Sequence, residues 1–230
     1  MTSFIQYLTD LPLLELIAML LSLAYVLLAA RGSIWCWPAA FISTGIYSVI
    51  FYDVSLLMDS LLSAYYLVMA VYGFWMWRTH SKKDAKKTAK SLSSDNFKVI
   101  SWSFRIHLIA CLSLTFCGFG LGYVMDNYTN ASFAYLDTFT TVFAVFATYL
   151  VTQKVLENWL YWVVIDFVSI YLYIEKGLMP TVVLFIFYVI IAGYGFIKWR
   201  AIYQSNRLKS NTLSKTLSHA SNNTLNDATN

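Results

Sequence analysis

The chain has 230 residues, of which 59% are hydrophobic and only 12% are charged, and its mean hydropathy is +0.59. Because roughly 25% of the residues in an average soluble domain are charged, this composition excludes an ordinary soluble protein. The net charge of +4 reflects membrane topology and not nucleic-acid binding, and the three cysteines have no disulfide or metal-ligand spacing.

Apolar segments of about 20 residues recur along the whole chain, and an α-helix needs this length to cross a hydrocarbon layer of roughly 30 Å. The sequence therefore predicts an all-α integral membrane protein. Its seven predicted membrane-spanning helices cover residues 12–30, 34–52, 55–77, 99–125, 136–152, 158–174 and 178–199.

Two hydrophilic segments separate or follow these spans. Residues 78–98 form a basic loop, for which we predict a cytoplasmic location and contact with anionic lipid, because Lys and Arg stay on the cytoplasmic side. Seven alternating spans then place the N-terminus outside and the C-terminus inside. Residues 200–230 are rich in Ser, Asn, Thr and Lys and poor in apolar residues, so we predict a disordered cytoplasmic tail.

An internal repeat is the strongest feature of the sequence. The third span ends in YGFWMWR at residues 72–78 and the seventh in YGFIKWR at residues 194–200, a shift of 122 positions (194 minus 72). The same shift pairs Trp37 with Trp159 and Tyr66 with Tyr188. Chance matching of aromatic residues is the alternative, and duplication is the favoured interpretation.

Duplication predicts a 3+1+3 architecture. Residues 12–77 and 136–199 are two parallel three-helix repeats, and 99–125 is a linker helix between them. Transporters built from parallel repeats bind their substrate near the membrane midplane, between the repeats, and rock one half against the other. The architecture therefore predicts a carrier.

The sixth span places a carboxylate deep in the membrane. Trp159, Trp162, Asp166, Ser169 and Tyr173 lie three or four residues apart and share one helix face. At ~1.5 Å per residue, Asp166 lies roughly 13 Å inside the cytoplasmic boundary. An ionisable group at that depth costs at least ~2.5–3.5 kcal/mol and usually serves a substrate or an ion.

A carboxylate beside two indole rings suits a flat, cationic ring, because the faces of tryptophan attract cations. Alternative roles are a hydrogen bond to a neighbouring span or proton coupling for Asp166, and an interfacial position for Trp159. The shift of 122 (166 minus 44) pairs Asp166 with Thr44, which favours one asymmetric pocket. The other predicted substrate-binding residues are Trp37, Thr44, Tyr188 and Tyr194. We predict no catalytic residues, metal or cofactor.

The segment ENWLYWVVIDFVSI, the tryptophan-rich second span and the two YGFxxWR ends together resemble the Pnu family of bacterial vitamin transporters. The resemblance implies the 3+1+3 architecture shared with SWEET sugar carriers and a multi-pass location in the bacterial inner membrane. It implies facilitated diffusion, with a cytoplasmic kinase trapping the vitamin as its phosphate, and aromatic site walls at Trp159 and Trp162. Where the nicotinamide riboside carriers have an asparagine, this chain has Asp166.

The predicted function is transport of nicotinamide riboside or a closely similar cationic B-vitamin. Thiamine also has a quaternary nitrogen, so a thiamine carrier is the main alternative; a proton-coupled carrier and a sugar carrier are further ones. The deep ionisable residues are too few and scattered for an enzyme, and the loop and tail are too short for a receptor's output domain. The sequence is compatible with a homo-oligomer.

Overall fold

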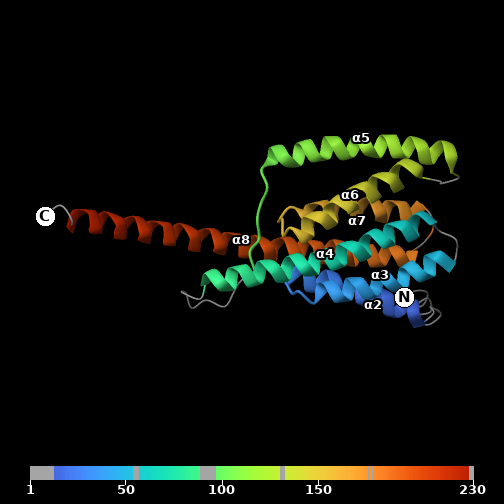
Figure 1. Cartoon of the computed structure of the whole chain (residues 1–230). Coiled ribbons are helices and arrows are strands. Elements are labelled where there is room, and N and C mark those ends of the chain that lie inside the picture. The colour runs from blue at the N-terminus through green and yellow to red at the C-terminus, as the bar shows by residue number, and fades with distance from the viewer. Residues whose placement is uncertain are drawn as a thin grey trace.

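The computed structural model describes residues 13–53, 57–88, 97–129, 133–175, 177 and 179–227. These residues form seven helices that run along one common direction (Figure 1). The helices are α2 (Leu13–Ala30), α3 (Cys36–Asp53), α4 (Leu57–Thr88), α5 (Phe104–Tyr128), α6 (Ala134–Thr152), α7 (Asn158–Glu175) and α8 (Met179–Asp227). Each predicted span falls on one of them, in the predicted order.

The helices contact one another in a defined pattern. α3 packs between α2 and α4, and α7 packs between α6 and α8. Further contacts join α2 to α8 and α4 to α6, so the first and last three helices enclose a common interior. α5 lies on the outside, against α6 (Figure 1). Its close approach depends on Gly118, where an added Cβ would lie 2.8 Å from the ring of Phe139.

The linker helix begins later than predicted, at Phe104 instead of residue 99. Residues before it are extended because their backbone pairs with the turn between α6 and α7. The Ile100 N–H donates to the Lys154 carbonyl at 3.0 Å, and the Leu156 N–H donates to the Ile100 carbonyl at 2.8 Å. This tertiary pairing consumes hydrogen-bonding groups that a helix would need, so the helix starts after it.

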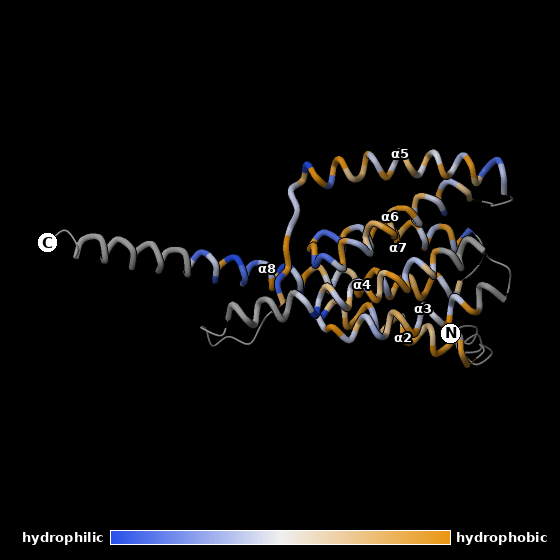
Figure 2. Tube along the Cα trace, viewed as in Figure 1, coloured by the Kyte–Doolittle hydropathy of each residue, from blue (hydrophilic) through white to orange (hydrophobic). Residues whose placement is uncertain are grey.

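Both hydrophilic segments contain more helix than predicted. α4 continues to Thr88, into the predicted basic loop, while residues 89–96 lie outside the described residues. α8 continues to Asp227, which corrects the prediction of a disordered tail for residues 200–227. That stretch contains no Gly or Pro, and each residue added to an existing helix gains a backbone hydrogen bond without a new nucleus. Figure 2 shows that α8 becomes hydrophilic where it leaves the bundle.

The outer surface of the bundle is apolar, as a lipid-facing surface must be. On α7, Leu160, Val164 and Phe167 are 47%, 63% and 57% exposed, whereas Asp166 is 4% exposed. Three stretches in the described part of the chain are long and apolar enough to cross a membrane: Phe104–Tyr128, Ala134–Thr152 and Thr181–Thr212. The helix α7 is not among these three stretches, because its tryptophans, tyrosines and carboxylates lower its mean hydropathy. Its outer face is nevertheless apolar. The described residues thus form an all-helical bundle with the apolar outer surface expected of a membrane protein.

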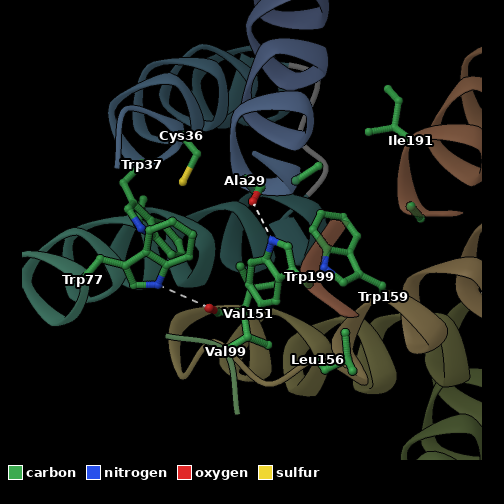
Figure 3. Close-up of a cluster of buried hydrophobic side chains, with 13 residues drawn as sticks. Ala29, Cys36, Trp37, Trp77, Val99, Val151, Leu156, Trp159, Ile191 and Trp199 are labelled. Carbon is green, nitrogen blue, oxygen red and sulfur yellow. Dashed lines mark hydrogen bonds between the residues drawn. The ribbon is translucent and has the colours of Figure 1, made fainter. Parts of the chain in front are cut away.

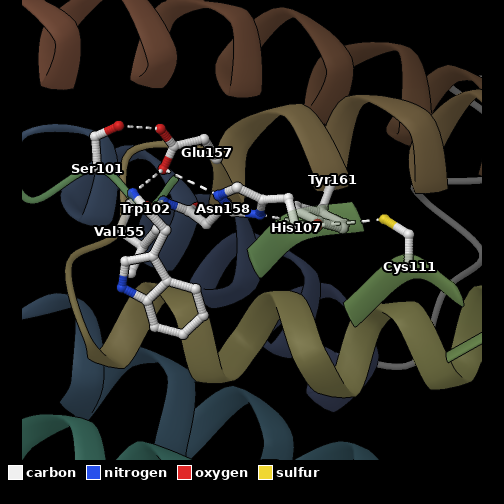
Figure 4. A network of polar contacts seen from close by, with 8 residues as sticks. All are labelled: Ser101, Trp102, His107, Cys111, Val155, Glu157, Asn158 and Tyr161. Carbon is white, nitrogen blue, oxygen red and sulfur yellow. Dashed lines mark hydrogen bonds and ion pairs between the residues drawn. The ribbon is translucent and has the colours of Figure 1, made fainter. Parts of the chain in front are cut away.

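A polar network fixes the start of α5 against α7 (Figure 4). The Glu157 carboxylate accepts hydrogen bonds from the Ser101 hydroxyl and from the Trp102 backbone N–H. The His107 Nδ1 lies 3.0 Å from the Tyr161 hydroxyl, one turn further along α7. Glu157 therefore ties the linker helix to the second half of the molecule, at the end of the bundle from which α8 projects. We call this the α8 end.

Candidate functional site

A cavity of about 710 Å³ lies between α2, α3, α4, α6, α7 and α8. Its size falls within the roughly 300–1,000 Å³ typical of small-molecule sites. It extends along α7 from Trp159 to Tyr173, over most of the length of that helix. Aromatic and aliphatic side chains dominate the lining, and the polar groups are few. Those with ionisable or hydroxyl side chains are Ser22, Tyr25, Ser43, Thr44, Tyr47, Tyr66, Thr148, Asp166, Tyr173, Thr181 and Tyr188.

Asp166 contributes the cavity's carboxylate. It is 4% exposed and lies midway along α7, whose other face is turned outward. Among the residues that the structure describes, none forms a hydrogen bond or ion pair with this carboxylate, so the alternative of a bond to a neighbouring helix is not realised. Removing an ion from water costs several kcal/mol, and a partner normally compensates that cost. Here the space for a partner is the cavity.

The two predicted aromatic residues of α7 both line the cavity. Trp159 is 2% exposed and lies edge-on to Trp199, with ring centroids 5.5 Å apart and planes at 89°. A residue of an interfacial belt would face lipid and water, so this burial does not fit the interfacial alternative. Trp162, one turn further, is half-buried and packs against Ile165 and its neighbours.

Six of the eight predicted substrate-binding residues line the cavity. They are Trp37, Thr44, Trp159, Trp162, Asp166 and Tyr188. The Tyr188 hydroxyl lies 2.8 Å from the Ser22 hydroxyl and so links α8 to α2. Ser169 is buried but does not line the cavity. Tyr194 is 39% exposed and does not line the cavity, and the Lys198 ammonium lies 6.0 Å from its ring.

Sequence reasoning missed Tyr25, Tyr47 and Thr148, which also line the cavity. The internal repeat contains a signal for Tyr47. The cavity-facing positions predicted on α7 are 159, 162, 166 and 169, and subtracting 122 from each gives positions 37, 40, 44 and 47 on α3. All four of these α3 residues line the cavity. Tyr25 and Thr148 lie on α2 and α6, where no spacing pattern distinguishes them.

A layer of four buried tryptophans borders the cavity at the α8 end (Figure 3). Trp37 and Trp159 line the cavity, and Trp77 and Trp199 lie behind them. Trp37 meets Trp77 edge-on with centroids 5.4 Å apart and planes at 89°, the geometry already seen for Trp159 and Trp199. The rings of Trp77 and Trp199 are 6.2 Å apart and join the two pairs.

Hydrogen bonds in this layer cross from one half of the chain to the other. The Trp77 Nε1–H donates to the carbonyls of Val151 and Thr152, at 3.3 and 3.2 Å, at the end of α6. The Trp199 Nε1–H donates to the Ala29 carbonyl at 3.1 Å, at the end of α2 (Figure 3). The donors are 122 positions apart (199 minus 77), and so are the acceptors Ala29 and Val151 (151 minus 29).

Two glycines at the same shift allow these tryptophans to pack closely. A Cβ on Gly195 would lie 2.7 Å from ring atoms of Trp159, and a Cβ on Gly73 would overlap the ring of Trp37. Real Cβ atoms do not approach that closely, so each glycine provides the space for an indole of the neighbouring helix. The YGFxxWR ends therefore combine a glycine that receives one tryptophan with a second tryptophan that bonds to the other half.

Comparisons with known proteins place this geometry in a family of transporters. The sequence model of the family described as nicotinamide mononucleotide transporter matches residues 12–201. The nicotinamide riboside transporter PnuC of Escherichia coli (strain K12) is 24% identical over 207 residues, which cover 83% of this chain and 86% of that protein. The riboflavin/roseoflavin transporter RibM of Streptomyces davaonensis is 22% identical over 186 residues, covering 80% and 83%.

The fold is also similar to a solved structure. The crystal structure of the vitamin B3 transporter PnuC superimposes with a TM-score of 0.67 and 20% sequence identity, covering 84% of this chain and 82% of that one. At this identity the likeness shows the fold. Because the family match extends over residues 12–201, the chain belongs to the nicotinamide mononucleotide transporter family, the Pnu family that the ENWLYWVVIDFVSI segment predicted.

Proposed function

We propose that the protein is a multi-pass carrier of the bacterial inner membrane that transports nicotinamide riboside or a closely similar cationic B-vitamin. The observation that carries this proposal is the Asp166 carboxylate, which is buried beside a cavity and has no partner among the described residues. A quaternary nitrogen in a flat ring would supply the missing charge and would stack on Trp159 and Trp162. The functions named for PnuC relatives support the same substrate class.

We further propose that the two halves are parallel repeats in a 3+1+3 arrangement, with the N-terminus outside and the C-terminus inside. Support for the repeat comes from the paired tryptophan contacts, which recur at a shift of 122 (199 minus 77). Support for the orientation comes from exposed Arg31 and Lys198 at the α8 end and exposed Asp126 and Glu175 at the opposite end.

Transport then follows from movement of one half against the other. The cavity reaches from the tryptophan layer toward the start of α8, so entry from outside requires little rearrangement of that layer. Release into the cytoplasm requires the cross-half bonds of Trp77 and Trp199 to break. We propose facilitated diffusion, with a cytoplasmic kinase keeping the vitamin inside as its phosphate.

Thiamine is the second candidate substrate, because its thiazolium ring is flat and permanently cationic and would satisfy the same carboxylate. Riboflavin, which the relative RibM transports, is uncharged and would leave Asp166 without a counter-charge. A sugar carries no charge to pair with Asp166 and does not need the indole rings of both Trp159 and Trp162. Proton coupling through Asp166 is the remaining alternative, since the group can take up a proton in place of a cationic substrate.

Uptake by proteoliposomes tests the proposal. We expect labelled nicotinamide riboside to equilibrate across the membrane faster than riboflavin, and an uncoupler that collapses the proton gradient to leave the final internal concentration unchanged. Asp166→Ala should abolish this uptake while the protein still inserts. Loss of uptake on uncoupling would assign Asp166 to proton coupling, and wild-type uptake by Asp166→Ala would contradict a substrate role.

A further inference from the structure

A second hollow, separate from the central cavity, lies at the α8 end of the bundle. It has a volume of about 420 Å³ and forms where the end of α2, the segment before α5 and the emerging part of α8 meet. Figure 1 shows these three segments converging at the point where α8 leaves the bundle. The vitamin pathway proposed above does not use this hollow.

The hollow is strongly basic. Among the residues that the structure describes, its lining includes Arg31, Lys198 and Lys209 and no acidic residue. In the described part of the chain, none of these three side chains takes part in an ion pair. The Lys198 ammonium lies 6.0 Å from the ring of Tyr194, and no described carboxylate pairs with it. Three cations around one concave surface attract an anion.

The walls of the hollow are held in place by contacts of their own. Lys198, Ser205 and Lys209 are seven and four residues apart, so they lie on one stripe of α8. The Asn206 side-chain amide donates to the Phe97 carbonyl at 3.3 Å, which fixes the segment before α5 against α8. Ser205 and Asn206 add groups that can hydrogen-bond to phosphate oxygens.

The position of the hollow indicates where its ligand comes from. Lys198 is the first charged residue of α8. Before it, the helix presents apolar side chains on its surface, among them Ile190 and Ile197, which are 62% and 69% exposed. A bilayer would place these isoleucines among acyl chains and the cations just beyond them, at the level of the lipid phosphates. Basic pockets at this level between membrane helices are suited to anionic headgroups.

We propose that this hollow binds the phosphate of an anionic phospholipid headgroup. The site depends on the chain spanning a membrane and not on which vitamin the carrier transports. Each Lys or Arg near an anionic lipid surface contributes on the order of a fivefold gain in affinity. Loss of all three cations should therefore weaken lipid binding by roughly a hundredfold.

Native mass spectrometry of the full-length protein in neutral detergent tests the proposal. We expect the wild type to retain phosphatidylglycerol in preference to phosphatidylcholine. The variant Arg31→Gln/Lys198→Gln/Lys209→Gln should lose this preference. The matched control Arg105→Gln/Arg200→Gln/Arg207→Gln removes the same charge from exposed positions that do not line the hollow and should retain it.

Other outcomes overturn the proposal. Equal losses in the two triple variants would mean a diffuse attraction to positive charge, without a site. Binding of glycerol 3-phosphate with no preference for phosphatidylglycerol would mean a site for soluble phosphate esters. Should the first triple variant fail to fold, Lys209→Gln alone decides, because Lys209 is exposed and lies beyond the packed bundle. Unchanged lipid preference in that variant would also count against the site.

Discussion

Asp166 is a charge that the protein buries among aromatic rings without supplying its counter-charge. At 4% exposure it has lost most of its hydration, and the described residues offer neither an ion pair nor a hydrogen bond in return. A cation that enters the cavity compensates for the lost hydration of the carboxylate. The interaction with this unpaired charge therefore contributes to the affinity for the substrate. Thr44, the residue that a shift of 122 (166 minus 44) pairs with Asp166, lines the same cavity without a charge.

Substitution of Asp166 by Asn separates charge from shape. A quaternary nitrogen has no N–H, so its attraction to Asp166 is an ion pair and not a hydrogen bond. Removing one charge of a buried ion pair costs about 3–5 kcal/mol, so Asp166→Asn should weaken binding of nicotinamide riboside by at least roughly 100-fold. Isothermal titration calorimetry on the purified protein would measure this loss. Asp126→Asn, the same change at an exposed position on α5, is the control and should leave the affinity unaltered. An equal affinity in Asp166→Asn would mean that shape alone holds the vitamin.

Residue positions on a single helix were predictable, and positions that depend on packing were not. The 3.6-residue period brings Trp159, Trp162 and Asp166 to one face, and the structure has all three at the cavity. Ser169 belongs to the same face by periodicity, yet neighbouring helices decide which part of a face borders a cavity. Tyr25 and Thr148 reach the cavity only because α2 and α6 pack beside it.

At the scale of helices, the approach of α7 to α8 depends on a missing side chain. Gly195→Ala would push its Cβ into Trp159, at 2.7 Å, and should destabilise the protein by ~1–3 kcal/mol while displacing a wall of the cavity. Thermal unfolding followed by tryptophan fluorescence, with vitamin affinity measured in parallel, checks this expectation.

The chain contains a matched control for that substitution. Gly193 lies two residues earlier on the same helix, and a Cβ there would meet no atom within 4 Å. Gly193→Ala should therefore be neutral or slightly stabilising, because alanine is the better helix former. If both alanine variants unfolded at the wild-type temperature, the close packing of Trp159 on Gly195 would contribute nothing to stability.

Helix order was predictable because apolar runs of about 20 residues have one stable form in a bilayer. The ends of the helices were less so. The start of α5 depends on the pairing of Ile100 with the turn after α6, a contact that no local pattern encodes. The length of α8 depends on continuation from a helix already formed in the bundle, whereas composition alone favoured disorder.

At the scale of the whole molecule, the proposed transport cycle requires the tryptophan layer between the cavity and the α8 end to open. Trp77→Phe and Trp199→Phe each remove one indole donor and keep an aromatic ring. A hydrogen bond contributes about 1 kcal/mol, so each change should shift the equilibrium toward an open layer by about fivefold. The labelling rate of Cys36, which is 0% exposed within this layer, reports the opening.

The measurement uses a background in which Cys111 and Cys117 are replaced by Ser, so that Cys36 is the single reactive thiol. Both phenylalanine variants should react faster with a maleimide than this background, and by similar factors. Trp75→Phe changes a tryptophan that is 60% exposed and should leave the rate unchanged. A response in one half only would contradict the equivalence of the two halves.

The hydrogen bonds of the tryptophan layer join one half of the chain to the other, so neither half supplies both the donor and the acceptor of such a bond. α4 carries Trp77 but finds the acceptor on α6, and α8 carries Trp199 but finds its acceptor on α2. A shortened polypeptide ending at residue 88 would thus hold an indole donor that only a second polypeptide could satisfy. Two such copies, each placing the end of its α2 against the other's α4, would rebuild the layer, which is the arrangement expected if the proposed duplication joined two copies of one repeat.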